Sequence, residues 1–247
     1  MPEKIQKVLA QIGLGSRRQI ERWIEEGRIQ VNKKVAEIGQ RLSGTETINF
    51  DGRIIALQRQ NKTKPKLLLY HKPEGEICTR ADEKDRPTVY DHLPRLTHSR
   101  WISIGRLDLN TSGLLLFTND GELANKLMHP STGIEREYAV RILGEVDKAT
   151  LTRLRTGVEL EDGMAHFDQI IDAGGQGANH WYHVILHEGR NREVRRLWES
   201  QGVMVSRLTR VRFGNITLPR FLRKGKWKYA DESQLTSLYQ LVASDDK

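Results

Sequence analysis

The first 50 residues contain apolar side chains at two different spacings, one typical of helices and one typical of strands. These spacings predict two helices followed by strands. Apolar side chains recur at i, i+3, i+4 and i+7 over residues 5–12, which is the spacing of one helical face. Ser16 occupies the N-cap position of a second helix, which ends at Gly27. Residues 28–31 and 47–50 have the composition of short strands. This region therefore predicts a compact unit of two helices and short strands.

Longer apolar runs separated by turn sequences follow in the rest of the chain. Residues 66–71 and 114–118 indicate buried strands, and residues 122–128 can form a helix that stops before Pro130. The polar loop 106–113 directly precedes the second of these strands. Functional residues concentrate in loops that a rigid strand positions, so we expect a site in this loop.

A polar segment separates the two regions. Residues 58–65 lack apolar periodicity and include a proline, which is typical of a linker. A chain of 247 residues has room for one large domain or two smaller ones. We therefore expect two domains, residues 1–62 and residues 63–247.

The charge is unevenly distributed along the chain. The formal net charge is +8, with +5 in residues 1–62, −4 in residues 63–189, +10 in residues 190–228 and −3 in residues 229–247. Two basic blocks of this kind suit a polyanion, because each neutralised phosphate releases counterions. A solvated surface without a partner is the alternative that charge alone leaves open.

Composition excludes several other classes of protein. No apolar run approaches the roughly 18–20 residues of a membrane span, and the N-terminal residues lack the apolar core of a signal peptide. A single cysteine, Cys78, excludes an internal disulfide framework and a cysteine-based zinc cluster. His180, His183 and His187 do not share one face of their predicted strand, so we expect no metal site. A cytoplasmic protein fits these features.

The N-terminal unit resembles the S4 RNA-binding domain. The matching segment is GLGSRRQIERWIEEGRIQVNKK, residues 13–34, in which a basic turn leads into the second helix. The resemblance implies that the basic face of this helix and the turn before it bind structured RNA, whereas ordinary surface residues are the alternative. The basic residues expected to contact RNA are Lys7, Arg17, Arg18, Arg22 and Lys34.

The remainder resembles the RNA pseudouridine synthases of the family that includes the small-subunit synthase A and the large-subunit synthases. The segment GRLDLNTSGLLLFTNDG, residues 105–121, resembles the catalytic motif of that family, and residues 70–79, 135–140 and 188–200 resemble three further motifs. The resemblance implies an α+β fold. We expect a small N-terminal S4 domain of two helices and short strands, then a catalytic domain with a mainly antiparallel central sheet and flanking helices.

The same resemblance implies a reaction that needs neither a cofactor nor a metal. Uracil is detached from its ribose at N1, turned, and rejoined through C5, with Asp108 close to C1′. Whether the aspartate attacks covalently or abstracts a proton to give a glycal stays open. Arg195 is expected to form an ion pair with Asp108, with a phosphate contact or a solvated position as the alternative. Tyr138 is expected to pack on the target base, with an ordinary core tyrosine as the alternative.

Other residues are expected to bind the RNA or shape the site. A target base has to be flipped into a pocket, and Arg106 resembles the arginine that fills the vacated space or holds the flipped nucleotide. Position 113, a glycine, is expected to need a small residue. Trp198 is expected in the core and Trp227 at an RNA-facing surface. Two further arginines are expected to contact RNA, Arg190 and Arg192.

The resemblance is closest to members that act on the large ribosomal subunit. We therefore expect isomerisation of one uridine in 23S rRNA, with free rRNA or a large-subunit assembly intermediate as the partner. A monomer is expected, with no protein partner and no membrane. Three alternatives stay open: the same chemistry on another 23S or a 16S uridine, an S4-type ribosome-assembly protein without turnover, and an RNA N-glycosidase.

Overall fold

A computed structural model describes residues 2–57, 64–80, 82, 84–97, 99–144 and 146–243. Most of the linker predicted at 58–65 lies outside these described residues. The chain divides into two compact units. The first holds residues up to 66 together with 94–102 and 119–121, and the second holds the rest.

The first unit contains two helices, as expected, and more strands than the sequence pattern indicates. Ser16 caps the second helix, because its Oγ accepts a hydrogen bond from the amide of Gln19 at 3.1 Å. A four-stranded antiparallel sheet has the order β3-β2-β5-β6, and β1 pairs with β4. The elements are β1 (Glu3–Lys4), α1 (Ile5–Gln11), α2 (Arg17–Glu25), β2 (Ile29–Val31), β3 (Lys34–Val35), β4 (Arg41–Leu42), β5 (Ile48–Phe50) and β6 (Arg53–Ile55).

The apolar faces predicted for the two helices form the core of this unit. Ile5 and Leu9 of α1 are fully buried, as are Ile20 of α2 and Ile48 of β5. The period of the apolar positions therefore marks the buried face correctly in both helices.

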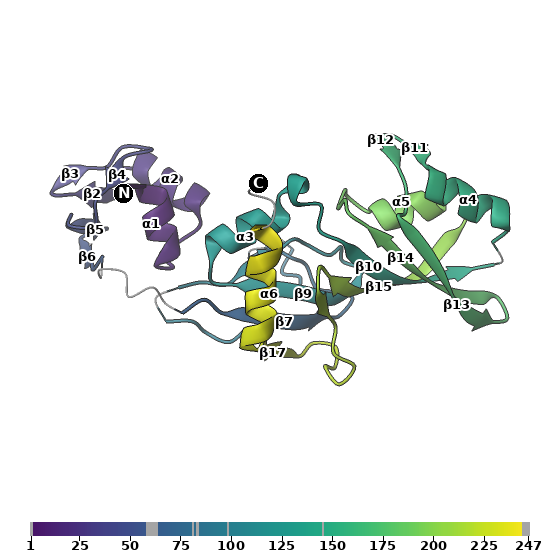
Figure 1. Cartoon of the computed structure of the whole chain (residues 1–247). Helices are drawn as coiled ribbons and strands as arrows, with labels where there is room; N and C mark the ends of the chain where they lie inside the picture. Colours follow the sequence, from purple (N-terminus) through teal and green to yellow (C-terminus); the bar gives the residue numbers. More distant parts are fainter. Residues whose placement is uncertain are drawn as a thin grey trace. The chain divides into compact units, whose positions relative to one another are not determined.

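The second unit is built on a nine-stranded sheet with the order β13-β14-β10-β15-β9-β7-β17 (Figure 1). Strand β16 pairs with β15, and β8 pairs with β9. Along the order given, every neighbouring pair is antiparallel except β15 and β9. The expected α+β class and mainly antiparallel central sheet are confirmed. The strands are β7 (Leu67–Lys72), β8 (Ile102–Ile104), β9 (Ser112–Thr118), β10 (Arg136–Leu143), β13 (Gln169–Gln176), β14 (Asn179–Leu186), β15 (Met204–Phe213), β16 (Ile216–Thr217) and β17 (Trp227–Tyr229).

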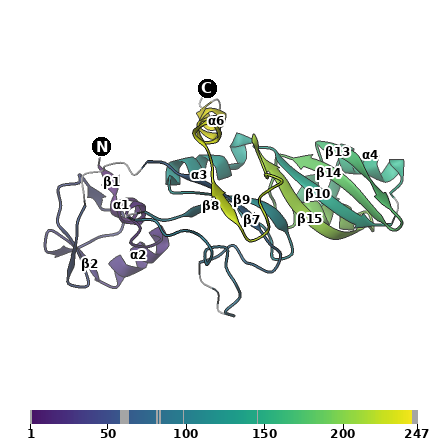
Figure 2. The same cartoon turned by 90° about the horizontal axis from the view of Figure 1, so that it is seen from below.

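Helices cover parts of this sheet. Helix α6 (Glu232–Ala243) crosses one face near β7 and β9 in both views (Figures 1 and 2). Helix α4 (Lys148–Thr156) contacts β13, and α5 (Glu193–Glu199) contacts β15. The remaining elements are α3 (Gly121–Met128), the 3₁₀ turn Pro130–Thr132, and the hairpin of β11 (Val158–Leu160) and β12 (Gly163–Ala165). None of the helices described here has the length and apolar character that crossing a bilayer requires.

Strand β9 is buried along its whole length, which explains its continuous apolar run. All seven of its residues are buried, from Ser112 to Thr118. A strand covered on both faces has no polar side, so its sequence does not alternate. Because β9 is rigid and central, the loop that precedes it starts from a firmly held point.

Candidate active site

Asp108 lies in a tight turn immediately before β9. The amide of Thr111 donates to the carbonyl oxygen of Asp108 at 3.0 Å, which closes the turn. The Asp108 side chain is half-buried, whereas Leu109 and Asn110 are exposed. The turn thus presents a carboxylate at the edge of a buried strand.

Lys72, the last residue of β7, donates hydrogen bonds to the backbone of this turn. Its side chain is fully buried, and its Nζ donates to the carbonyl oxygens of Asp108 at 3.0 Å and Thr111 at 2.9 Å. Burial lowers the pKa of Lys72, while the nearby charges of Cys78, Glu76 and Asp108 favour its protonated form. A buried ammonium group therefore links two strands through the backbone of the turn.

Arg195 of α5 also donates a hydrogen bond to the backbone of this turn. Its Nη2 donates to the carbonyl oxygen of Asn110 at 2.8 Å, and its Nη1 donates to that of Val205 at 2.9 Å. The direct ion pair expected between Arg195 and Asp108 is not formed among the described residues, because the planar guanidinium is already engaged by two carbonyls. Burial, followed by the charge of Arg192, lowers the pKa of Arg195, and the charge of Asp108 opposes this shift.

Two further residues, Gly75 and Cys78, complete the support of the turn. The amide of Gly75 donates to the carbonyl oxygen of Leu109 at 2.9 Å. The thiol of Cys78 donates to the carbonyl of Leu107 at 3.3 Å, and its sulfur accepts from the Leu107 amide at 3.4 Å. All four carbonyls from Asp108 to Thr111 are thereby hydrogen-bonded, so the backbone position of the carboxylate is fixed independently of its side chain.

Tyr138 lies two strands away from the end of this turn. It pairs with Arg210 across β10 and β15, and Arg210 pairs with Gly113 across β15 and β9. Strands lie about 4.8 Å apart, so the backbones of Tyr138 and Gly113 are separated by roughly 10 Å. Tyr138 is 9% exposed, and its hydroxyl has no hydrogen-bond partner within the described residues.

Gly113 permits the close approach of β9 and β15. A Cβ at this position would lie 2.2 Å from the carbonyl oxygen of Arg210, and the residue has a φ of +112°. Both features exclude a larger side chain. The expected need for a small residue at Gly113 is confirmed.

A β-bulge distributes charged side chains to the two faces of the sheet. The register between β10 and β15 shifts between Glu137 and Tyr138. Arg210 therefore pairs with Tyr138, where its Nε donates to the carbonyl of Leu114 at 2.8 Å, whereas Arg212 pairs with Glu137. Bulges often redirect side chains beside functional sites.

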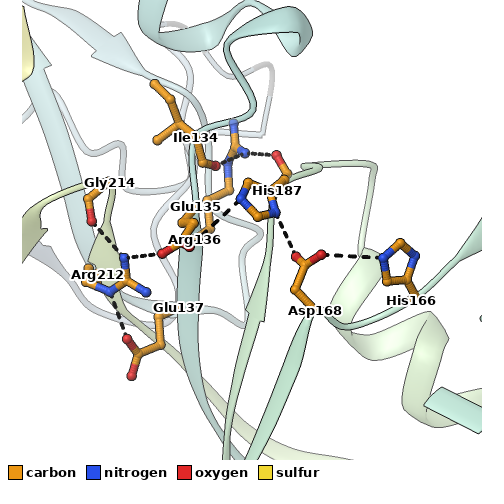
Figure 3. Close-up of polar contacts among 9 residues, drawn as sticks. All are labelled: Ile134, Glu135, Arg136, Glu137, His166, Asp168, His187, Arg212 and Gly214. Carbon is orange, nitrogen blue, oxygen red and sulfur yellow. Dashed lines mark hydrogen bonds and ion pairs between the residues drawn. The ribbon is translucent and has the colours of Figure 1, made fainter. Parts of the chain in front are cut away.

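Figure 3 shows a cluster of polar contacts around the first residues of β10. Arg212 donates to Glu137 at 2.8 Å and to Glu135 at 2.7 Å, and Arg136 is turned toward the carbonyl oxygens of Ile134 and His187 (Figure 3). His187 lies 2.9 Å from Asp168 (Figure 3).

The three histidines of β14 and its end contact different carboxylates. His180 lies 2.6 Å from Asp172, and His183 lies 2.7 Å from Glu137. The described residues contain no group of three or more histidine, cysteine or carboxylate side chains arranged to hold a metal ion.

Comparison with known proteins identifies the family. The sequence model of the RNA pseudouridylate synthase family matches residues 66–200, and that of the S4 domain matches residues 3–48. The chain belongs to the RNA pseudouridylate synthase family.

Relatives of this pseudouridine synthase match it along nearly its full length. It is 58% identical to "Ribosomal large subunit pseudouridine synthase B" of Haemophilus influenzae over 97% of this chain and 68% of the relative. The protein of the same name from Escherichia coli K12 is 56% identical over 98% of this chain and 84% of the relative. A solved pseudouridylate synthase is similar in fold, with a TM-score of 0.65 at 22% identity, covering 95% of this chain and 99% of that one.

The arginines expected to contact RNA in this pseudouridine synthase differ in their surroundings. Arg106 is exposed and forms no ion pair with any described carboxylate. Arg190 contacts Glu188 at 2.5 Å and also donates to carbonyls of the β11–β12 hairpin. Arg192 contacts Glu199 at 3.1 Å. The positive charges of Arg190 and Arg192 are thus largely compensated by carboxylates of the protein itself.

The basic residues of the N-terminal unit show a similar division. Arg17, Arg18 and Lys34 are exposed without a carboxylate partner among the described residues. Lys7 contacts Glu3 at 2.5 Å, and Arg22 contacts Glu26 at 2.8 Å. The first three side chains are therefore the most available to a polyanion.

Sequence patterns did not single out two cations of the pseudouridine synthase site. Lys72 directly follows the apolar strand predicted over residues 66–71, and Arg210 is one of many residues in a basic block. Lysine and arginine are rarely buried, so periodicity offers no signal for such positions. Trp198 is fully buried, as expected.

Proposed function

We propose that this chain converts one specific uridine of 23S rRNA in the large ribosomal subunit to pseudouridine. Membership of the RNA pseudouridylate synthase family supports the chemistry, and the 58% identical relative named for the large ribosomal subunit supports the target. The observation that carries the mechanism is the half-buried carboxylate of Asp108, whose turn is held by hydrogen bonds from Lys72 and Arg195. Free rRNA or a large-subunit assembly intermediate is the partner.

Asp108 acts at C1′ of the target nucleotide. The N1–C1′ bond breaks, uracil turns, the C5–C1′ bond forms, and the proton on C5 is lost while N1 gains one. Attack on C1′ and removal of a ribose proton both require an ionised carboxylate in a fixed position. The held turn supplies that position because no hydrogen bond from the protein competes for the carboxylate oxygens within the described residues.

Tyr138 packs on the base that is being turned. Its ring is mostly buried in the sheet, and its hydroxyl is free of protein partners among the described residues. A ring with a free hydroxyl can support the uracil and accept or return a proton at the same time.

Arg195 and Arg106 have different roles in this proposal. Arg195 positions the turn through the carbonyl of Asn110, and its charge lies close enough to Asp108 for the two to interact. Arg106 is exposed and lies two residues before Asp108 in the sequence. It binds the flipped nucleotide or fills the space that the nucleotide leaves in the RNA.

Residues outside the catalytic loop bind the RNA substrate. We propose that residues 1–62 form the S4-like domain and that Arg17, Arg18 and Lys34 bind phosphates of structured rRNA, with Lys7 and Arg22 at the margin of this surface. The isomerisation is neutral in electrons and mass, so it runs without a redox cofactor. A monomer in the cytoplasm is sufficient for the reaction.

The experiment compares two single substitutions in a strain that lacks the gene. Carbodiimide mapping of 23S rRNA should show restoration of the missing pseudouridine by the wild type and no restoration by Asp108→Asn. Asp85→Asn is the matched control, because Asp85 is exposed and has a φ of +49°, a conformation that asparagine also tolerates. Modification by Asp108→Asn at the wild-type level would overturn the catalytic assignment. Release of free uracil would indicate an N-glycosidase instead.

A further inference from the structure

Most positive charges of the C-terminal basic block, residues 190–228, fall into two groups. Outside both groups, Arg195 and Arg210 donate to backbone carbonyls, and Arg207 is exposed without a carboxylate partner among the described residues. In the first group, arginines from α5 and β15 form ion pairs within the protein. Arg196 contacts Asp162 at 2.8 Å, and Arg212 contacts Glu135 at 2.7 Å, in addition to the pairs of Arg190 and Arg192 described above. A paired arginine contributes little to the attraction of a distant polyanion, because its carboxylate cancels its field.

The second group lies in the segment that joins β16 to β17 (Figure 1). Residues 219–228 contain five cationic side chains and no carboxylate. Four of these cations are exposed, and none of the four forms an ion pair with a described carboxylate. The four are Arg220, Arg223, Lys224 and Lys226. Four of the five exposed cations of the block that lack a carboxylate partner among the described residues therefore lie here, and Arg207 is the fifth.

The backbone of this segment is firmly held. The amide of Leu222 donates to the carbonyl of Pro219 at 3.0 Å, which forms a tight turn, and Leu222 itself is 6% exposed. His71 of β7 accepts from the amide of Gly225 at 2.8 Å, donates its own amide to Lys226 at 3.0 Å, and contacts the Leu222 carbonyl through its ring at 2.7 Å. The buried Leu222 and the three contacts with His71 anchor the segment to β7.

Phe221 is exposed on this rigid support. Phe221 is 74% exposed, whereas the adjacent Leu222 is buried and supplies the apolar contact of the turn. The ammonium group of Lys228 lies 5.7 Å from the ring centroid. An exposed phenylalanine in a segment whose cations lack carboxylate partners among the described residues has the chemistry of a platform for nucleic-acid bases.

Trp227 does not provide this platform, contrary to the expectation from sequence. Its indole Nε1 donates to the carbonyl of His92 at 2.9 Å, and its ring lies 5.4 Å from that of Tyr229. The indole is half-buried and its polar atom is satisfied. The neighbouring loop therefore presents Phe221, which the aromatic count along the sequence did not distinguish from Trp227.

We propose that residues 219–228 bind unpaired nucleotides of the substrate rRNA, with one base stacked on Phe221 and phosphates bound by the surrounding cations. This inference rests on the proposed function, since it assumes that the substrate is RNA. His71, which holds the segment, is the neighbour of Lys72, which holds the Asp108 turn. The segment and the proposed catalytic loop are thus fixed to the same end of β7. Single-stranded binding is favoured over duplex binding because a paired base cannot offer its face to an isolated ring.

The test uses the full-length protein with two RNA probes, a labelled single-stranded oligonucleotide and transcribed 23S rRNA. Phe221→Ala should weaken oligonucleotide affinity about tenfold, the order expected for one stacked base. It should raise KM for 23S rRNA by a similar factor and leave kcat unchanged. Phe221→Tyr should retain affinity, whereas Phe221→Leu should behave like alanine because it keeps apolar area without a ring. Met204→Ala is the control, since Met204 is 65% exposed in the same unit.

Charge is tested separately by salt dependence. Lys224→Gln should reduce the slope of log affinity against log salt by about 0.7, the value for one phosphate contact with a single strand. Lys148→Gln removes one exposed charge from α4 and should leave the slope unchanged.

The outcomes separate this inference from the proposed function. If wild type isomerises 23S rRNA while Phe221→Ala binds both probes normally, the stacking platform is overturned and the proposed function stands. If wild type fails to isomerise 23S rRNA but Phe221→Ala loses oligonucleotide affinity, the RNA platform is supported and the proposed function is overturned. A defect seen only on assembly particles, with normal binding of both RNA probes, would indicate a protein partner and overturn the inference.

Discussion

The buried ammonium group of Lys72 donates to the backbone carbonyl oxygen of Asp108 at 3.0 Å. The proposed catalytic carboxylate is therefore held through its main chain by a cation from another strand. Its side chain is left without a protein hydrogen bond among the described residues. This arrangement fixes the position of the carboxylate and keeps its oxygens available to the ribose.

Lys72→Met should reduce both stability and activity. The substitution removes the Lys72 donor from the Thr111 carbonyl and leaves the Asp108 carbonyl with the Thr111 amide alone, which costs about 1–3 kcal/mol in the free energy of unfolding. Urea unfolding measures this loss, and single-turnover rates at a permissive temperature measure the effect on chemistry. Lys148→Met is the control, since Lys148 is exposed. Wild-type rates in a folded Lys72→Met protein would contradict a positioning role for Lys72.

Arg195→Lys tests whether Arg195 acts by geometry or by charge alone. Lysine keeps the positive charge but cannot reach the carbonyls of Asn110 and Val205 with two separate, fixed donors. We expect kcat to fall on the order of 10- to 100-fold with little change in KM, because a small displacement of a reacting group has an effect of this size. Retention of full kcat by Arg195→Lys would instead support a purely electrostatic role.

Gly113→Ala should be more destabilising than the same change at an unobstructed glycine. The added Cβ would lie 2.2 Å from the Arg210 carbonyl oxygen, in a residue with a φ of +112°. The left-handed conformation costs about 1–2 kcal/mol and overpacking adds about 1–3 kcal/mol. Gly144→Ala is matched to it, because Gly144 has a φ of +93° and nothing within 4 Å of the added Cβ. Thermal unfolding should show a larger loss of stability for Gly113→Ala than for Gly144→Ala. Equal losses of stability in the two variants would contradict the steric argument.

Glu193 should make stability depend on pH. Burial raises the pKa of Glu193 to about 7, a hydrogen bond from the Arg190 amide opposes this, and the charge of Glu188 adds to it. Because the folded pKa lies above the ordinary value of 4.5, the native state binds more protons than the unfolded state between these two values. The contribution of Glu193 to stability is therefore lost as pH rises through this window.

Glu193→Gln removes this dependence while keeping an oxygen that can accept from Arg190. At about pH 8 the variant should be more stable than wild type by on the order of 2 kcal/mol, and at about pH 4.5 the difference should disappear. Urea unfolding at several pH values checks both the sign and the window. If the free energy of unfolding of the wild type instead increased relative to that of Glu193→Gln from about pH 4.5 to about pH 8, the raised pKa of Glu193 would be contradicted.

Apolar periodicity determined the helices of the N-terminal unit and the principal buried strands. The face of α2 that buries Ile20 and the continuous run of β9 were both readable from the sequence, because burial selects apolar residues at the period of the element. The short strands β3, β4 and β6 were not predicted. Strands of two or three residues are too short to carry a measurable period.

The sequence also determined the family, the position of Asp108 and the presence of two basic blocks, since these depend on residue identity along the chain. Only the tertiary structure decided which cations hold the Asp108 turn and which are free. Lys72, Arg195 and Arg210 are buried by contacts from strands and helices far apart in the sequence, and Arg192 is neutralised by Glu199. Burial and pairing depend on distances in space, and the order of residues along a chain does not contain those distances.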